Sequence, residues 1–200
     1  MPSNQPIGIF DSGFGGLTVA RAIIDLLPSE DIVYFGDTSR YPYGPQPLEE
    51  VKSYSQQISD YLIAEHDVKM IVIACNTASA AAEGDLRDST EIPIVGVITP
   101  GAQAVVEVSS TKRIGVIGTV GTINSQAYDK AIKGISPENI ELVSVACPGF
   151  VEFVERGEFE GEQVRILADR LLAPVIQADV DALLLGCTHY PYLALSLIHI

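Results

Sequence analysis

The 200-residue sequence is poor in basic residues, since 12 Lys and Arg stand against 26 Asp and Glu and give a formal net charge of −14. A nucleic-acid-binding surface needs clustered Lys and Arg, so we expect no nucleic-acid partner. No apolar run approaches the roughly 18 residues that span a membrane, so we expect no membrane partner. The opening residues, MPSNQ, lack the basic and apolar regions of a secretory signal.

Cysteine and histidine are also scarce, with three of each and no Cys-x-x-Cys motif. This usage is typical of a reducing cytoplasm rather than of a disulfide framework, so we expect a cytoplasmic protein. Tetrahedral zinc sites need three or four protein ligands, and the pair Cys187 and His189 supplies too few, so no metal is expected. The GFGG turn at residues 13–16 lacks both the dinucleotide-fingerprint spacing and the Lys of a phosphate-binding loop.

Apolar runs alternate with helical patterns along the whole chain. In the first half they predict strands at residues 6–10, 31–36, 69–74 and 92–98, and helices at 17–27, 49–65, 78–88 and 100–108. The pattern then restarts, with strands expected at 113–118, 140–146 and 180–186, each roughly 110 residues after its counterpart. Chance similarity between such units is common, but the shared order favours an internal duplication.

These patterns predict an α/β fold with two pseudo-symmetric domains, each built on a mainly parallel central sheet. The expected domains are residues 1–98 and 99–194. Open α/β sheets hold ligands at the carboxyl ends of their strands, and clefts between domains are frequent ligand positions. We therefore expect an active site in the interdomain cleft.

Two cysteines follow buried apolar strands in matching positions of the two halves, Cys75 and Cys187. A position just before a helix N-terminus favours the thiolate, and both cysteines are expected to have this setting. A lone cysteine after an apolar strand is usually a small core residue, and this is the interpretation for Cys147. The matched pair and its polar followers favour chemistry instead.

Further polar residues occur near these strand ends. His189 could orient a thiol or exchange protons with it, Asp11 could serve an amine or a thiol, and Ser12 with the turn amides could hold a carboxylate. Thr119 and Thr122 occupy the equivalent turn of the second half. Each of these residues alone is more often a helix cap than a ligand contact, so the hypothesis rests on their convergence.

Six segments together make the sequence resemble the glutamate racemase family. They are Gly8-Ile-Phe-Asp-Ser-Gly-x-Gly-Gly-Leu-Thr18, Tyr41-Pro-Tyr-Gly44, Ala74-Cys-Asn-Thr-Ala78, Gly118-Thr-x-x-Thr122, Ala146-Cys-Pro148 and Gly186-Cys-Thr-His-Tyr-Pro191. The resemblance implies cofactor-independent interconversion of L- and D-glutamate, which supplies D-glutamate for peptidoglycan in cell wall biogenesis. It implies no pyridoxal phosphate and no metal.

The resemblance also assigns roles to residues. Cys75 and Cys187 would exchange the Cα proton on opposite faces of the substrate, assisted by Asp11, His189 and Glu155. The groups expected to hold the amino acid are Asp11, Ser12, Tyr43, Gly44, Asn76, Thr77, Thr119, Thr122, Thr188 and His189. Because the Cα proton is very weakly acidic, such a site must also supply preorganised donors and exclude water.

The sequence departs from the family at its end. Members continue past the second cysteine motif, so we expect a C-terminally truncated chain whose first domain lacks its returning segment. Residues 195–200, LSLIHI, match one reading frame of a transposase sequencing adapter, and we expect a non-native tail there. The alternatives that remain open are a racemase for aspartate or another amino acid, and a non-catalytic binding protein, for example a DNA gyrase inhibitor. A homodimer is also an open expectation.

Overall fold

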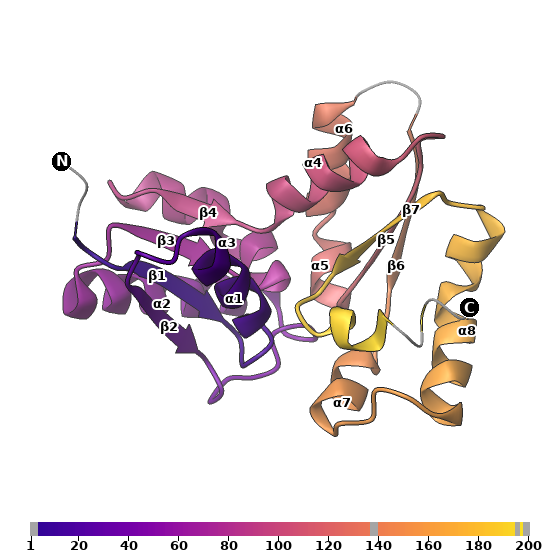
Figure 1. The fold of residues 1–200 in the computed structure, drawn as a ribbon, viewed down its shortest axis with the longest axis horizontal. Helices are drawn as coiled ribbons and strands as arrows, with labels where there is room; N and C mark the ends of the chain where they lie inside the picture. The colour runs from indigo at the N-terminus through magenta and orange to yellow at the C-terminus, as the bar shows by residue number, and fades with distance from the viewer. Residues whose placement is uncertain (1–3, 137–139, 195–196, 198–200) are drawn as a thin grey trace. The chain divides into compact units, whose positions relative to one another are not determined.

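The computed structural model describes residues 4–136, 140–194 and 197, and the chain divides into two compact units, Met1–Val97 and Ile98–Ile200 (Figure 1). Part of the expected tail at 195–200 lies outside the described residues. Both units are α/β, and every strand pairing within them is parallel, as predicted. In the described part of the chain, no helix combines the length and the apolar character needed to cross a membrane.

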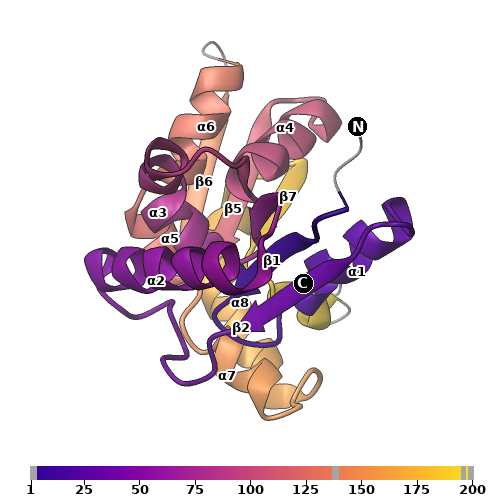
Figure 2. The same ribbon diagram turned by 90° about the vertical axis from the view of Figure 1, so that its left-hand side faces the viewer.

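The first unit is a four-stranded sheet with the order β2-β1-β3-β4. Its strands are β1 (Ile7–Asp11), β2 (Ile32–Gly36), β3 (Met70–Ile73) and β4 (Ile94–Gly96). Helices α2 (Leu48–His66) and α3 (Asn76–Ser89) pack on the face that carries Phe10 and Ile73. Helix α1 (Leu17–Leu26) packs on the other face against Ile9 (Figure 2). Alternate residues of β1 therefore enter two cores, which explains why all five of its residues are buried.

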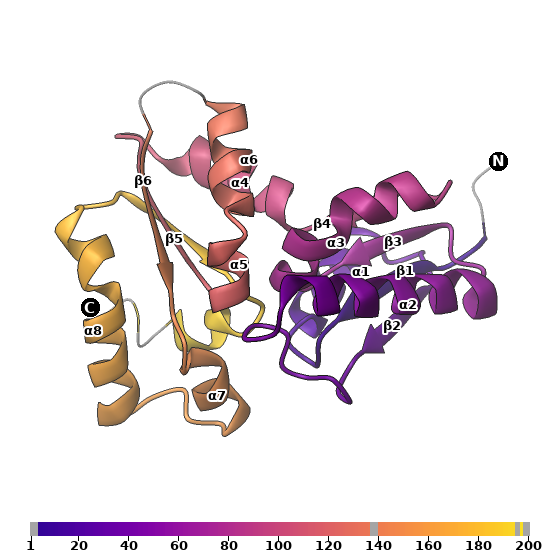
Figure 3. The same cartoon turned by 180° about the vertical axis from the view of Figure 1, so that it is seen from behind.

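The second unit is a three-stranded sheet with the order β6-β5-β7. Its strands are β5 (Arg113–Gly118), β6 (Glu141–Ala146) and β7 (Ala182–Gly186). Its helices are α4 (Ile98–Val108), α5 (Val120–Asn124), α6 (Ala127–Ile135), α7 (Phe150–Glu155), α8 (Glu162–Gln177) and the 3₁₀ helix η1 (Tyr190–Leu193). Helix α8 packs through Ala168 and Leu172 on a core that includes Ile117 of β5 (Figure 3).

The two sheets repeat one arrangement. The first strand of each unit lies between the second and third, so that β2-β1-β3 corresponds to β6-β5-β7. Cys75 follows β3 and Cys187 follows β7, so the two cysteines occupy corresponding positions in the two sheets. The repeat predicted from the sequence is confirmed at the level of sheet topology.

The element bounds differ from the predicted ones in two informative places. Helix α3 begins at Asn76 rather than at residue 78, because the Cys75 side chain caps it. The predicted strand 92–98 is only Ile94–Gly96, and α4 begins at Ile98 rather than at Pro100. A proline in the first turn of a helix costs no hydrogen bond there, so Pro100 does not mark the helix start.

Candidate active site

The turn after β1 is built around the Asp11 carboxylate. Asp11 is fully buried, and its Oδ2 accepts hydrogen bonds from the backbone N–H groups of Gly13 at 3.0 Å and Gly16 at 3.1 Å. The sequence predicts that the turn amides bind a ligand carboxylate. Two of these amides bind the Asp11 carboxylate of the turn itself, and the role of Ser12 and the other turn amides stays a prediction.

Cys75 lies at the N-terminus of α3, within hydrogen-bonding distance of the Asp11 turn. Its sulfur accepts the Ala78 N–H at 3.4 Å, and its thiol donates to the Ser12 Oγ at 3.9 Å. Asn76 and Thr77 form the first turn of α3 and are buried as well. The fold therefore brings Asp11, Ser12, Cys75, Asn76 and Thr77 together, and Tyr43 of the loop after β2 lies in the same buried cluster as Cys75.

Burial sets the protonation of Cys75. It is the largest cause of a raised thiol pKa, and the negative charge of Asp11 adds to it. The hydrogen bonds from Ala78 and Ser12 act in the opposite direction but are weaker, so the pKa of Cys75 rises to about 12. The helix N-terminus favours the thiolate of Cys75, as the sequence predicts, but desolvation disfavours the anion more strongly.

We predict that alkylation of native Cys75 by iodoacetamide keeps accelerating with pH well above the ordinary thiol value of 9.0, toward about 12. Only the thiolate reacts, and the fold keeps this thiol protonated. Peptide mass spectrometry of samples quenched between pH 7 and 11 measures the rate, with urea-unfolded protein as the control that should level off near pH 9. A native profile that also levels near pH 9 would contradict the raised pKa.

The raised pKa of Cys75 also makes the stability of the folded state depend on pH. Above the thiol pKa of the unfolded chain, unfolded molecules lose the Cys75 proton while folded molecules keep it. The contribution of Cys75 to folding is therefore complete below about pH 9 and decreases as pH rises toward about 12.

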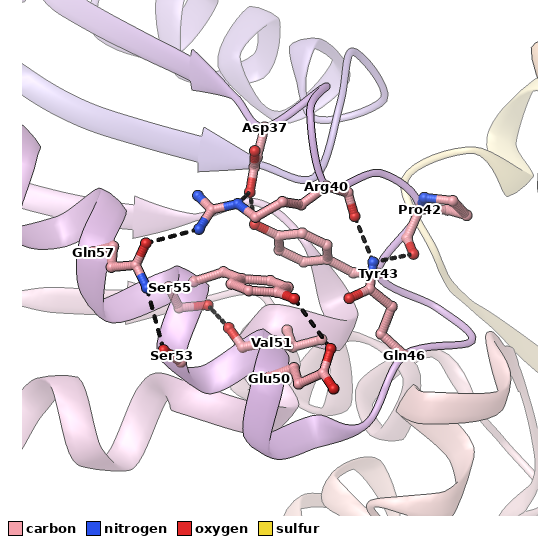
Figure 4. A network of polar contacts seen from close by, with 11 residues as sticks. Asp37, Arg40, Pro42, Tyr43, Gln46, Glu50, Val51, Ser53, Ser55 and Gln57 are labelled. Carbon is pink, nitrogen blue, oxygen red and sulfur yellow. Dashed lines mark hydrogen bonds and ion pairs between the residues drawn. The ribbon is translucent and has the colours of Figure 1, made fainter.

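Tyr43 lies in the loop between β2 and α2, and its hydroxyl contacts another residue of that loop. Tyr43 is buried in the core of the first unit, and its hydroxyl donates to the carboxylate of Asp37 (Figure 4). Gly44 is half-buried in the turn that follows. The Tyr43 hydroxyl proton is therefore used within the fold, and a substrate contact of Tyr43 or Gly44 stays a prediction.

The second unit places Cys187, His189 and Glu155 in one chain of contacts. The Cys187 sulfur lies 3.9 Å from Nδ1 of His189, and Nε2 of His189 lies 2.8 Å from Oε1 of Glu155. A carboxylate only accepts hydrogen bonds, so Nε2 carries the proton of this contact. In the neutral imidazole, Nδ1 is then an acceptor that faces the thiol. The contact with Glu155, at the end of α7, was predicted through the family resemblance alone.

The chain after Cys187 begins differently from the chain after Cys75. It passes through a turn into the 3₁₀ helix η1, whose N-cap is His189, and Ala194 is helical as well. In the first unit α3 begins directly after Cys75, whereas the buried His189 lies two residues after Cys187. The helix context of Cys187 stays a prediction. Thr188 is also buried, and its Oγ1 lies 3.3 Å from Nδ1 of His189.

Thr119 and Thr122 lie at the strand end next to Cys187. Gly118 pairs with Gly186, so the residues that follow these two glycines leave the sheet side by side. Thr119 caps α5 by accepting the Thr122 N–H at 3.2 Å, and the two hydroxyl oxygens are 3.0 Å apart. Thr119 therefore has the capping role that is the ordinary use of threonine, and its hydroxyl also contacts that of Thr122 in the neighbourhood that the sequence predicts.

The third cysteine is a core residue. Cys147 is buried in the cluster around Phe150 and Leu172, and its thiol donates to the Val145 carbonyl at 3.8 Å. Burial alone raises its pKa to about 12. Within the ranges 4–136, 140–194 and 197, no group of three or more His, Cys, Asp or Glu side chains is placed to hold a metal ion.

Comparison with known proteins places this geometry in a family. The family model of the Asp/Glu/hydantoin racemases matches residues 8–198. A glutamate racemase of Parafrankia sp. is 52% identical over 191 residues, which cover 96% of this chain and 68% of the relative. The chain belongs to the Asp/Glu/hydantoin racemase family.

Solved structures agree with this assignment. A glutamate racemase isoform from Bacillus anthracis matches with a TM-score of 0.93 and 43% identity, covering 98% of this chain and 73% of that one. The glutamate racemase of Francisella tularensis, solved in complex with D-glutamate, matches with a TM-score of 0.92 and 41% identity over the same shares. The racemase family thus accounts for the α/β fold across nearly all of this chain.

Two polar residues in the loop after β2, Asp37 and Arg40, were not predicted from the sequence. Asp37 is buried directly after the strand, and Arg40 donates to it at 2.6 Å. The rule that polar residues at the carboxyl ends of parallel strands form sites could have found Asp37. No local pattern marks Arg40, because its partners outside the loop lie on α2.

Proposed function

We propose that this racemase-family protein interconverts L- and D-glutamate by two thiols, without a cofactor. The observation that carries the proposal is the pair of cysteines at corresponding strand ends, Cys75 after β3 and Cys187 after β7. Inversion at Cα needs one group that removes the proton and another that delivers a proton to the opposite face. Two like residues from two like sheets suit this requirement.

In the second unit, Cys187 would act with its imidazole. His189 presents Nδ1 to the thiol and is held from behind by Glu155, so it can accept the thiol proton and return it. Such a base, oriented by a third group, is the usual arrangement for activating a nucleophile or base. Proton transfer by a positioned group contributes about 10²–10⁴-fold to a rate.

In the first unit, Cys75 would act as the proton donor in its resting form. Its raised pKa keeps it protonated near neutral pH, which suits delivery of a proton to a carbanion. When the roles reverse, Cys75 must lose its proton, and the Ala78 N–H and the Ser12 hydroxyl are placed to stabilise the thiolate. Asp11, whose charge opposes that anion, would favour the return of the proton or bind the substrate ammonium group.

Glutamate is favoured as the substrate because relatives at about half identity carry the name glutamate racemase. A family member 41% identical to this chain has been solved with D-glutamate. We propose that the product supplies D-glutamate for peptidoglycan, in the cytoplasm. Assembly as a homodimer stays a prediction.

Solvent isotope incorporation tests the proposal. When L-glutamate is converted in heavy water, we expect the D-glutamate formed to carry deuterium at Cα, because the delivering thiol exchanges with solvent before it protonates the carbanion. Proton NMR of the Cα position, together with chiral chromatography and mass spectrometry of the product, measures the label.

Three results of these assays would each contradict a different part of the proposal. Inverted product that keeps its original Cα hydrogen would rule out the two-thiol mechanism. Absence of glutamate inversion would remove the proposed activity itself. Aspartate, assayed under the same conditions, should be converted much more slowly, and a preference for aspartate would reassign the substrate.

A further inference from the structure

A polar network ties the loop after β2 to α2, and Arg40 is its centre (Figure 4). The guanidinium donates through Nε to Asp37 at 2.6 Å and through Nη1 to Gln57 at 2.9 Å. It also lies over the ring of Tyr54, 4.4 Å from the centroid. Arg40 therefore connects a buried carboxylate at the end of β2 with two side chains on α2.

The same network fixes the segment that carries Tyr43 and Gly44. The Tyr43 hydroxyl and the Arg40 Nε share the Asp37 Oδ2, and the Tyr43 ring packs on Tyr54 with centroids 5.7 Å apart. Gln46 donates to the carbonyl groups of both Arg40 and Pro42. Side chains and backbone of the loop are thus held at several points around Arg40.

This loop lies against the turn that binds Asp11. A Cβ at Gly13 would lie 3.2 Å from the Tyr41 ring, and the Tyr34 hydroxyl donates to the Gly13 carbonyl at 2.8 Å. The backbone N–H of Asp37 also donates to the Asp11 carbonyl at 3.0 Å. A shift of the loop would therefore change the surroundings of Asp11 as well as the position of Gly44.

We propose that Arg40 is a positioning residue that sets the affinity for glutamate by holding residues 41–44 against the Asp11 turn. The proposal rests on the proposed function and adds a residue outside the set of predicted site residues. Lysine cannot replace it, because a single ammonium group cannot donate to Asp37 and Gln57 in the fixed planar geometry while stacking on Tyr54.

The test is Arg40→Lys in the full chain. We expect KM for glutamate to rise about tenfold, as for the loss of one charge-assisted hydrogen bond and its packing, while kcat stays within about twofold. Gln57→Ala, which removes the hydrogen bond from Arg40 to Gln57 and leaves the Asp37 and Tyr54 contacts of Arg40 in place, should raise KM by a smaller factor. The matched control is Arg21→Lys on α1, where an exposed Arg21–Asp25 ion pair is changed in the same way and KM should not change.

A second readout does not depend on turnover. Trypsin cleaves after both Arg and Lys, so the rate of cleavage between residues 40 and 41 reports how firmly the loop is held in the wild type and in Arg40→Lys. We expect about tenfold faster cleavage in the variant. A lowered melting temperature with unchanged KM, or a loss confined to kcat, would overturn the positioning role.

The two readouts also separate this proposal from the proposed function. A wild type that does not invert glutamate would remove the activity, and with it the affinity role. In that case, unchanged cleavage in Arg40→Lys would further show that Arg40 does not hold the loop.

Discussion

Replacing Cys75 or Cys187 by serine is expected to lower kcat for glutamate inversion by about 10²–10⁴-fold, the contribution of a positioned proton-transfer group. A serine hydroxyl remains protonated at neutral pH and cannot remove the Cα proton, although it preserves the shape of the side chain. Loss of either thiol should slow conversion in both directions, because each direction uses both groups. Circular dichroism of glutamate solutions follows the conversion.

The chain supplies its own matched control for this experiment. Cys147→Ser makes the same chemical change in the core around Phe150, so activity should stay within about twofold of the wild type. Its cost should appear in stability, at about 1–3 kcal/mol, because a hydroxyl enters an apolar environment. Activity of Cys75→Ser within tenfold of the wild type, in protein that retains its far-ultraviolet spectrum, would contradict the assigned chemistry.

Gly16→Ala is expected to destabilise the first unit by about 1–3 kcal/mol, the usual cost of forcing an extra methyl group into a packed site. A Cβ at Gly16 would lie 2.5 Å from the Cβ of Asp11, 2.9 Å from the Tyr34 hydroxyl oxygen and 3.0 Å from the Cβ of Ala74. The turn must then move, and the hydrogen bond from Gly16 to Asp11 is lost or lengthened. Urea unfolding measures the free energy, and the activity assay should show a parallel loss.

Gly84→Ala, in the same unit, is expected to change the free energy of unfolding in the opposite direction. Gly84 is exposed within α3, and a Cβ added there would have no heavy atom within 4 Å. Alanine should therefore stabilise the helix by about 0.5–1 kcal/mol. If both substitutions changed the free energy of unfolding in the same direction, steric crowding at Gly16 would not explain the result there.

The architecture could be predicted from the sequence because it depends on repeated local patterns. Apolar runs marked the strands, and the order of elements marked the two halves; the matching sheets confirm both. Those patterns also placed Cys75 and Cys187 correctly at strand ends, since the end of an apolar run is visible in the sequence. The contact between His189 and Glu155 joins residues 34 positions apart, and only the family resemblance indicated it.

The chemistry of individual groups was harder to predict, because it depends on what the fold packs around them. The sequence shows that Cys75 precedes a helix, which favours the thiolate, but burial and the Asp11 charge reverse the outcome. It shows a GFGG turn but not that Asp11 occupies its amides. Arg40 was missed because Gln57, one of its partners, lies 17 residues away on α2.

The two thiols stand in unlike surroundings, one beside a carboxylate and a hydroxyl, the other beside an imidazole. The mirror-image forms of glutamate, however, have equal free energies in water. Thermodynamics therefore requires equal kcat/KM for the forward and reverse conversions, whatever the chemical inequality of the two halves. Any difference in kcat between the two enantiomers must be matched by a proportional difference in KM. The unlike surroundings of the two thiols can therefore affect the substrate concentration at which the enzyme saturates, but never the racemic end point.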